Sequence, residues 1–266
     1  MDTLQILVLS LIQGLTEFLP ISSSGHLILS PYLFGFRDQG LAFDVAVHFG
    51  SLGAVLLYFR KDVSDITVDW IRSLPENGPS TANSRMGWAV IIGTIPIVFA
   101  GLLLKSLIES EFRSPVIIGY ATIAFGLLLL WADKTSSRHR DQQSISIKDA
   151  LIIGLMQCLA LIPGTSRSGI TMTAGLMLGL TRQAASRFSF LLAIPTILMS
   201  SALVSYDLLR ANAPADWQAM LWGVLFSFIA AYACIHYFLR FIERIGMLPF
   251  VIYRLILGAV IFALIW

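Results

Sequence analysis

This sequence has little charge and almost no cysteine. Only 13% of its 266 residues are charged, against about 25% in an ordinary soluble domain, whereas 56% are hydrophobic. A soluble protein of this size could not cover so apolar a composition with a polar surface, so we expect the apolar residues to face lipid. We therefore predict a single membrane domain over residues 1–266.

The missing features exclude several classes of function. The net charge is only +2 and no run of Lys or Arg is longer than Arg60-Lys61, so we expect no nucleic-acid partner. The two cysteines, Cys158 and Cys234, are too few for a disulfide framework or a zinc site, and we expect them to pack in apolar segments. The N-terminus lacks a basic region and a small-residue cleavage pattern, so we expect the first apolar stretch to be retained.

Six stretches are long and apolar enough to cross a membrane, which requires roughly 20 residues in a helix. The pattern predicts an all-α polytopic membrane protein with spanning helices at about 41–59, 86–104, 115–132, 188–206, 217–239 and 248–266. Polar connections, the longest at 60–85, separate them and carry turn formers such as Pro75. These connections are too short for a second folded domain.

Two further apolar segments, at about 3–36 and 148–181, are interrupted by proline and a cluster of serine and glycine. In the first, we expect one helix to end at Leu19-Pro20 and a short second helix to run over about 26–33. Non-helical backbone at membrane depth is tolerated only where protein or a water-filled cavity surrounds it. The interruptions therefore predict two re-entrant helix-loop-helix hairpins.

The two interrupted segments resemble each other at a constant offset of 144 residues, for example from Ser22 to Ser166. The matching residues are Gln13, Leu15, Ser22, Ser24, Gly25 and Gly35, which recur as Gln157, Leu159, Ser166, Ser168, Gly169 and Gly179. Each half then contains one hairpin and three spans, and an odd number of spans turns the second half upside down. We predict inverted repeats over about 1–135 and 145–266, a plan found in transporters that bind substrates at broken helices.

The distribution of basic residues predicts the orientation. One side of this topology carries twelve Lys or Arg residues and the other carries four. The richer side is expected to be cytoplasmic. Both termini and the mouth of the first hairpin would then face away from the cytoplasm.

Ionisable residues near the two interruptions are candidates for function, because burying such a group in a membrane costs roughly 2.5–3.5 kcal/mol. They are Glu17, His26 and Arg167. Gln13 and Glu17 are four residues apart and share one helix face, which suits two oxygen ligands of a hard divalent cation. The alternative is a hydrogen-bonded pair that caps the hairpin.

The run Ser22-Ser23-Ser24-Gly25-His26 places hydroxyls and free N–H groups at a helix start, where the helix dipole favours phosphate. A serine near a histidine is also the pairing of a nucleophile with its base. The alternative is close packing of small residues. Arg167 begins a second such helix, and its planar guanidinium matches phosphate. The residues expected to bind substrate are Ser22, Ser24, Gly25, Ser166, Ser168 and Gly169.

Four other polar residues lie in or at the start of spans, and for each we favour hydrogen-bonded packing or a position at the membrane interface. They are Asp44, His48, His236 and Arg254.

Two motifs carry a family resemblance. Residues 13–26, Gln-Gly-Leu-Thr-Glu-Phe-Leu-Pro-Ile-Ser-Ser-Ser-Gly-His, and residues 163–169, Pro-Gly-Thr-Ser-Arg-Ser-Gly, are similar to signature motifs of the undecaprenyl-diphosphatase, or bacitracin-resistance, family. The segments 185–195 and 249–254 are similar to further family segments, so the resemblance covers nearly the whole chain. It implies dephosphorylation of undecaprenyl diphosphate, which regenerates the lipid carrier for peptidoglycan precursors.

Carried over by position, the resemblance implies that Glu17 handles metal or water, that Ser23 and His26 take part in the chemistry, and that Arg167 binds the diphosphate. It also implies a divalent cation, Mg²⁺ with Ca²⁺ as the alternative, held by Glu17 and Gln13. Two positions depart from the family: Gln13 stands where glutamate is frequent, and Arg187 stands where an acidic residue is common.

A polyprenyl-phosphate transporter or flippase is the main alternative, because inverted repeats and broken helices suit it equally well. An acid-phosphatase-like enzyme with a histidine nucleophile would need a second motif histidine, and His26 is the only one at either hairpin tip. The sequence leaves open whether a serine or a water attacks phosphorus, which prenyl chain length is preferred, and whether a homodimer forms.

Overall fold

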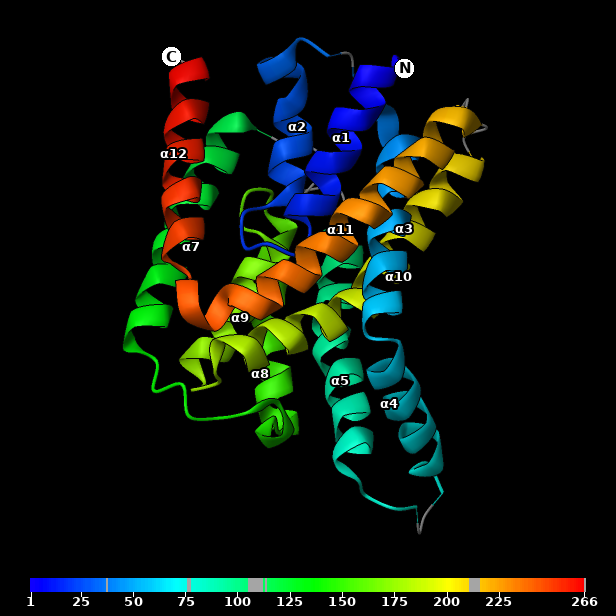
Figure 1. Ribbon diagram of the computed structural model, residues 1–266, viewed down its shortest axis with the longest axis vertical. Helices are drawn as coiled ribbons and strands as arrows, with labels where there is room; N and C mark the ends of the chain where they lie inside the picture. Colours follow the sequence, from blue (N-terminus) through cyan, green and yellow to red (C-terminus); the bar gives the residue numbers. More distant parts are fainter. Residues whose placement is uncertain (37, 76–77, 105–111, 113, 211–215, 266) are drawn as a thin grey trace.

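The structure is a computed structural model that describes residues 1–36, 38–75, 78–104, 112, 114–210 and 216–265. Over these residues the chain forms eleven α-helices, two short 3-10 helices and no β-strand (Figure 1). The α-helices are α1 (Thr3–Thr16), α2 (Ser23–Phe34), α3 (Gly40–Tyr58), α4 (Arg60–Arg72), α5 (Ala82–Leu103), α7 (Pro115–Thr135), α8 (Ile147–Gln157), α9 (Arg167–Met177), α10 (Arg182–Arg210), α11 (Trp217–Ile245) and α12 (Leu248–Ile265). The 3-10 helices are η1 (Gln142–Ser144) and η2 (Cys158–Leu161).

Six of these helices are long and apolar enough to cross a membrane, namely α3, α5, α7, α10, α11 and α12. The prediction of an all-α protein with six spans is therefore confirmed for the described part of the chain. The largest departures from the predicted bounds are in α10, which already begins at Arg182, and in α11, which continues to Ile245. Polar and charged residues lengthen both helices beyond their apolar stretches. Both termini lie at the same end of the molecule (Figure 1).

The connection predicted over 60–85 contains a helix, α4, that the search for long apolar runs missed. Charged residues recur along α4, so its composition is that of a connection rather than a span. Its apolar residues Val63, Ile66 and Trp70 nevertheless recur at helical spacing. Because they lie on one side, α4 packs along α5, and the rings of Trp70 and Trp88 meet edge to face at 5.7 Å.

The first interruption lies earlier than predicted. The helix expected to end at Leu19-Pro20 ends at Thr16, and the helix expected to begin at His26 begins at Ser23. Proline disfavours a helical conformation in the residue before it, which makes the chain leave the helix ahead of Pro20. Glu17 is thus the first residue after α1, and Ser23 is the first residue of α2. In the second segment, α8 continues directly into η2, and α9 begins at Arg167.

The two interruptions share an unusual local geometry. Ser22 and Ser166 both have positive φ angles, 73° and 70°, which are uncommon for residues other than glycine. The Oγ of Ser22 accepts the N–H of Gly25 at 3.4 Å, and the Oγ of Ser166 accepts the N–H of Gly169 at 3.1 Å. The two helix starts are thus alike at the offset of 144 residues. The repeat over the two halves, their inversion and the re-entry of the hairpins from the membrane surface stay predictions.

The end of α1 is positioned by a close helix crossing. A Cβ atom on Gly14 would lie 2.5 Å from the backbone oxygen of Ser227 on α11. Only glycine permits this approach, which brings the polar end of α1 into the protein interior. Both cysteines are free, as predicted.

Candidate active site

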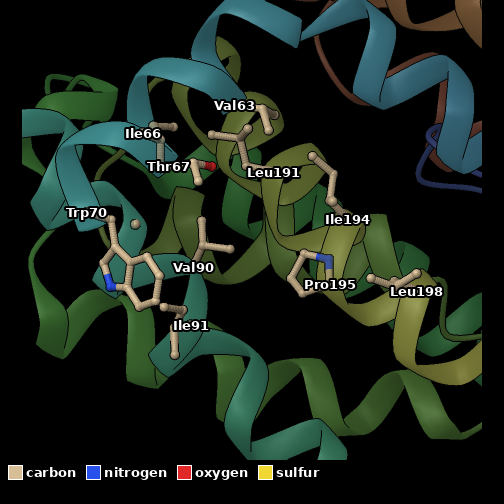
Figure 2. Close-up of a pocket in the computed structure, with 11 residues that line it drawn as sticks. Val63, Ile66, Thr67, Trp70, Val90, Ile91, Leu191, Ile194, Pro195 and Leu198 are labelled. Atoms are coloured by element: carbon tan, nitrogen blue, oxygen red, sulfur yellow. The ribbon is translucent and has the colours of Figure 1, made fainter. Parts of the chain in front are cut away.

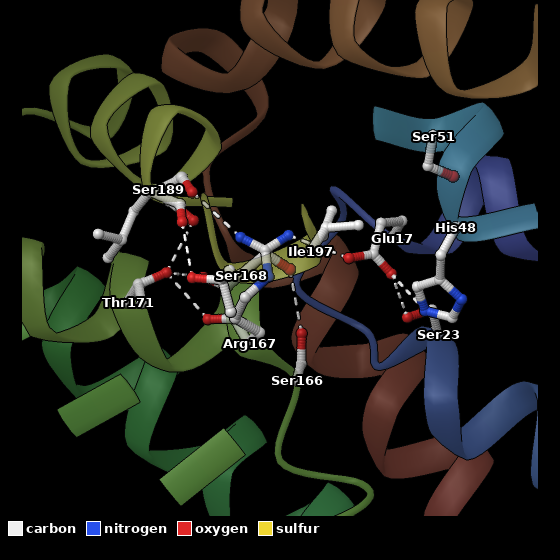
Figure 3. Close-up of polar contacts among 12 residues, drawn as sticks. Glu17, Ser23, His48, Ser51, Ser166, Arg167, Ser168, Thr171, Ser189 and Ile197 are labelled. Atoms are coloured by element: carbon white, nitrogen blue, oxygen red, sulfur yellow. Dashed lines mark hydrogen bonds and ion pairs between the residues drawn. The ribbon is translucent and has the colours of Figure 1, made fainter. Parts of the chain in front are cut away.

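Glu17 lies at the centre of the polar contacts where the two interruptions meet (Figure 3). Its side chain is buried, with 7% of its surface exposed. Oε2 accepts hydrogen bonds from the Ser23 hydroxyl at 2.6 Å and from the Gln13 amide at 3.0 Å. Oε1 forms an ion pair with the Arg167 guanidinium at 3.1 Å. Glu17 and Arg167 are 150 positions apart in the sequence, and the structure brings both together with Ser23.

The second interruption is anchored on both sides of Arg167. The other terminal nitrogen of Arg167 donates to the backbone oxygen of Ser189 on α10 at 3.1 Å. Ser168 donates its hydroxyl to the backbone oxygen of Leu19 at 2.7 Å. The guanidinium is therefore held between α10 and the first interruption, with its orientation fixed before any ligand arrives.

His26 does not contact Ser23, which corrects the expected serine–histidine pair. Nδ1 of His26 lies 2.7 Å from the backbone oxygen of Ser22, and Nε2 lies 2.6 Å from the hydroxyl of Tyr253 on α12. Because Nδ1 must donate to that carbonyl, Nε2 of the neutral ring accepts the tyrosine hydroxyl. His26 therefore holds the strained residue Ser22 in place, and the carboxylate of Glu17 is the base that lies beside Ser23.

His48 of α3 belongs to the site although we expected it to be a packing residue. Its Nε2 lies 3.7 Å from Oε2 of Glu17, close enough for an ion pair when the ring is protonated. Its Nδ1 lies 2.7 Å from the backbone oxygen of Asp44, which fixes the ring. The rule that ionisable residues inside spans are functional candidates by default would have identified His48, had it been applied to every span.

Arg254 of α12 is fully buried and structural, so the packing interpretation is confirmed for this residue. Its guanidinium donates to five backbone oxygens, those of Pro20, Ala121, Thr122, Gly164 and Thr165. These oxygens belong to both interruptions and to α7. Arg254 therefore fixes the two interruptions relative to each other, and with them the distance between Glu17 and Arg167.

The residues expected to bind substrate occupy several environments. The hydroxyls of Ser22 and Ser166 cap α2 and α9, and Ser168 joins the two interruptions. Ser24 is exposed, whereas Gly25 and Gly169 are buried in the first turns of their helices. Their role toward substrate stays a prediction.

Two other residues lie apart from these contacts. Arg187 contacts Asp62 at 2.6 Å and Gln142 at 2.8 Å and does not reach the site. His236 is exposed, with its ring against Tyr58.

The oxygen atoms near Glu17 are compatible with a divalent cation. Oε1 of Gln13 is buried and has no hydrogen-bond partner in the described part of the chain, which is unfavourable unless a cation or donor satisfies it. Within that same part, no group of three or more His, Cys, Asp and Glu residues could hold a metal. Gln13 and Glu17 would offer such a cation two side-chain oxygen ligands, with substrate or water oxygens completing its shell.

Comparisons with known proteins give the family. A family model described as "Bacitracin resistance protein BacA" matches residues 6–260. Undecaprenyl-diphosphatase 2 of Stutzerimonas stutzeri is 60% identical over 267 residues, which cover 99% of this chain and 98% of that protein. Undecaprenyl-diphosphatase of Alteromonas mediterranea is 57% identical over 261 residues, which cover 98% of each chain. Undecaprenyl-diphosphatase of Nitrosococcus oceani is 55% identical over 264 residues, which cover 99% of each chain. With the match spanning nearly its whole length, this chain belongs to the bacitracin resistance protein BacA family.

Proposed function

We propose that this chain is an integral membrane phosphatase that hydrolyses undecaprenyl diphosphate to undecaprenyl phosphate and inorganic phosphate. The reaction recycles the lipid carrier of cell-wall synthesis. The proposal is supported by the names of the relatives and by one structural observation above all. A buried carboxylate lies between a serine hydroxyl and an arginine in a protein with six apolar spans.

Ser23 is the proposed nucleophile and Glu17 its base. The hydroxyl already donates to Oε2 of Glu17 at 2.6 Å, which is the geometry that a general base requires. Ser23 Oγ attacks the terminal phosphorus while its proton passes to Glu17, and the bond from that phosphorus to the bridging oxygen breaks. Undecaprenyl phosphate leaves. Water then attacks the phosphorus of the phosphoserine, and the bond from that phosphorus to Ser23 Oγ breaks. Glu17 returns its proton to Oγ, and inorganic phosphate departs with the protons of the water.

Arg167 binds the phosphates in this proposal. Phosphoryl transfer depends mainly on positioning and on neutralising charge, and the guanidinium is held by Glu17 and by the Ser189 carbonyl. The first turns of α2 and α9 both start beside it, and their free N–H groups favour an anion. His26 acts through Ser22, whose carbonyl it fixes. Every side chain in this mechanism comes from one chain, so it does not require a homodimer.

Mg²⁺ is the proposed cofactor, with Ca²⁺ as the alternative. The side-chain oxygens of Gln13 and Glu17 would hold it, a pairing supported by the unpartnered Oε1 of Gln13 and by the preference of hard cations for oxygen ligands. When bound, the cation supplies positive charge that offsets the charge of the diphosphate.

We further propose that the protein lies in the bacterial inner membrane with the site open to the periplasm. The basic residues of the connections support this orientation by the positive-inside rule. An impermeant thiol reagent should label a cysteine added after residue 266 in intact spheroplasts. Protection of that cysteine until the membrane is permeabilised would reverse the orientation.

The decisive experiment for the activity is phosphate release by the purified protein in detergent. We expect release from undecaprenyl diphosphate, loss of release in a chelator, and recovery with Mg²⁺. A transporter would release no phosphate, because detergent removes the two compartments that transport needs. Absence of release at any metal concentration would contradict the proposed function, and full activity in chelator would contradict the cofactor alone.

A further inference from the structure

Two neighbouring cavities, the apolar part and the polar part of one candidate site, lie along α4 beside α5, α10 and η1, and none of the residues around Glu17 lines them. The first part has a volume of about 250 Å³ and an almost entirely apolar lining (Figure 2). Side chains of the three α-helices point into it, among them Val63 and Trp70 of α4, Val90 of α5, and Leu191 and Pro195 of α10. No residue of α4 is fully buried, so this helix does not close the space between its neighbours.

The second part has a volume of about 300 Å³ and a polar lining. It adjoins the apolar part at Ile66, which lines both. Its charged residues are Lys61, Asp62 and Asp65 of α4 and Arg187 of α10. The amides of Asn83 and Gln143 also line it.

The polar and apolar parts follow each other in the same order as the head groups and acyl chains of a membrane leaflet. The polar part is lined by the first two turns of the spans α5 and α10, for example by Ala82 and Arg187. The apolar part is lined by residues further along the same spans, up to Ile91 and Leu198. Apolar cavities exclude water, so hydrocarbon is the natural content of the inner part. The shape therefore fits an amphiphile whose head lies at the membrane surface and whose chain lies in the apolar part.

The charges indicate which head the polar part takes. Arg187 and Asp62 neutralise each other at 2.6 Å. Lys61 and Asp65 lie one helical turn apart, and neither forms an ion pair with any other residue that the structure describes. A purely anionic head would satisfy Lys61 but would place a like charge beside Asp65. A zwitterionic head satisfies both residues, with its phosphate at Lys61 and its ammonium at Asp65.

The neighbouring amides narrow the choice among zwitterions. The side-chain oxygens of Asn83 and Gln143 accept hydrogen bonds. A primary ammonium has N–H groups to donate to them, whereas a quaternary ammonium has none. The pocket therefore favours an ethanolamine head over a choline head.

From this combination we infer that the two cavities bind one phospholipid with an ethanolamine head, its phosphate at Lys61, its ammonium at Asp65 and an acyl chain against Trp70. The inference goes beyond the proposed activity and does not depend on it.

Native mass spectrometry of the purified full chain in detergent tests this inference. The protein is titrated with phosphatidylethanolamine, phosphatidylglycerol or phosphatidylcholine carrying identical acyl chains. We expect one phosphatidylethanolamine to be retained about fivefold more tightly than either other lipid, which corresponds to about 1 kcal/mol for a partly exposed pair of charges. Equal retention of the three lipids would overturn the inference.

Matched variants separate the two parts of the site. Thr67→Phe places a ring in the apolar part and should abolish retention, whereas Val68→Phe on the next residue, which does not line the cavity, should not. Lys61→Ala should weaken retention of all three lipids and Asp65→Asn should remove the preference for ethanolamine, whereas Lys148→Ala, at an exposed lysine outside the cavity, should change neither. Retention unchanged in both Thr67→Phe and Lys61→Ala would show that the lipid binds elsewhere and would contradict the proposal.

Discussion

Replacing Arg254 with methionine tests how the two interruptions are held together. The substitution keeps an unbranched apolar stem but removes the guanidinium, which leaves five backbone oxygens without their donor. Three of these contacts, to Thr122, Gly164 and Thr165, are 2.9 Å long. The other two, to Pro20 and Ala121, are 3.3 and 3.4 Å long.

The expected loss of stability follows from the three short contacts. Each buried acceptor left without a donor costs roughly 1–3 kcal/mol. The variant also no longer has to desolvate a buried charge, which offsets part of this loss of stability. We expect a net loss of about 3–5 kcal/mol, the range found when one partner of a buried charged contact is removed. At roughly 2 °C per kcal/mol for a chain of this size, the midpoint of thermal unfolding should fall by about 6–10 °C.

Thermal unfolding of the purified protein in one detergent measures this change, and phosphate release measures its effect on the site. Arg244→Met is the matched control, because Arg244 is exposed near the end of α11 and should lose almost nothing. Arg254→Lys should behave much like Arg254→Met, since a single ammonium cannot reach oxygens on both sides of a planar fork. If Arg254→Met unfolds within 2 °C of wild type, by the same rough conversion, and keeps normal activity, the reasoning fails.

Three further predictions concern Ser23, Arg167 and the contact between Arg140 and Asp149. Ser23→Ala should lose at least about 10⁴ in kcat while still binding substrate. A variant that keeps a tenth of kcat would instead make water the nucleophile, because losing a single hydrogen-bond donor costs roughly 10²–10³ in kcat or less. Arg167→Lys should lower kcat/KM by about 10² or more, because an ammonium cannot replace a fork held by two acceptors; near-normal kcat/KM would make this residue structural. Burial raises the pKa of Asp149, but hydrogen bonds from Arg140 and from Ser146 outweigh this and lower it from 3.8 to about 2. The ionised carboxylate therefore adds about 2 kcal/mol to the free energy of unfolding above pH 5, and this contribution is lost as the pH falls toward 2. Unfolding of Arg140→Met should therefore differ most from wild type near pH 7 and least near pH 3, and a constant difference over that range would contradict this assignment.

Composition and apolar runs were sufficient to predict the architecture but not the element bounds. The six spans follow from length and hydropathy alone, because a membrane imposes both. α4 was missed because Val63, Ile66 and Trp70 are interspersed with charges, and only their spacing indicates a helix. The helix α2 begins three residues before its predicted start because Ser22, which has a positive φ, caps it in place of the later residues of the serine run.

The motifs single out Glu17, Ser23 and Arg167 but not all their partners. The structure brings these three residues together, and their roles in the chemistry stay predictions. The partner of His26 could not be predicted, because Tyr253 is 227 residues away and lies in an ordinary apolar span. His48 was undervalued for a similar reason, since a lone histidine in a span carries no motif. Contacts between residues so far apart in the sequence depend on how the helices pack, and local sequence patterns do not determine that packing.

The place of Arg254 near the end of the chain has a consequence for biogenesis. Ribosomes deliver α1 to α11 to the membrane before α12, so both interruptions are inserted while their carbonyls still lack their donor. Unpaired carbonyls are poorly tolerated in lipid, so the nascent protein must keep these segments near water or near the insertion machinery until the last helix arrives. The site therefore takes its final form only when synthesis is nearly complete, since a chain that stops before residue 254 lacks the donor that joins the two interruptions.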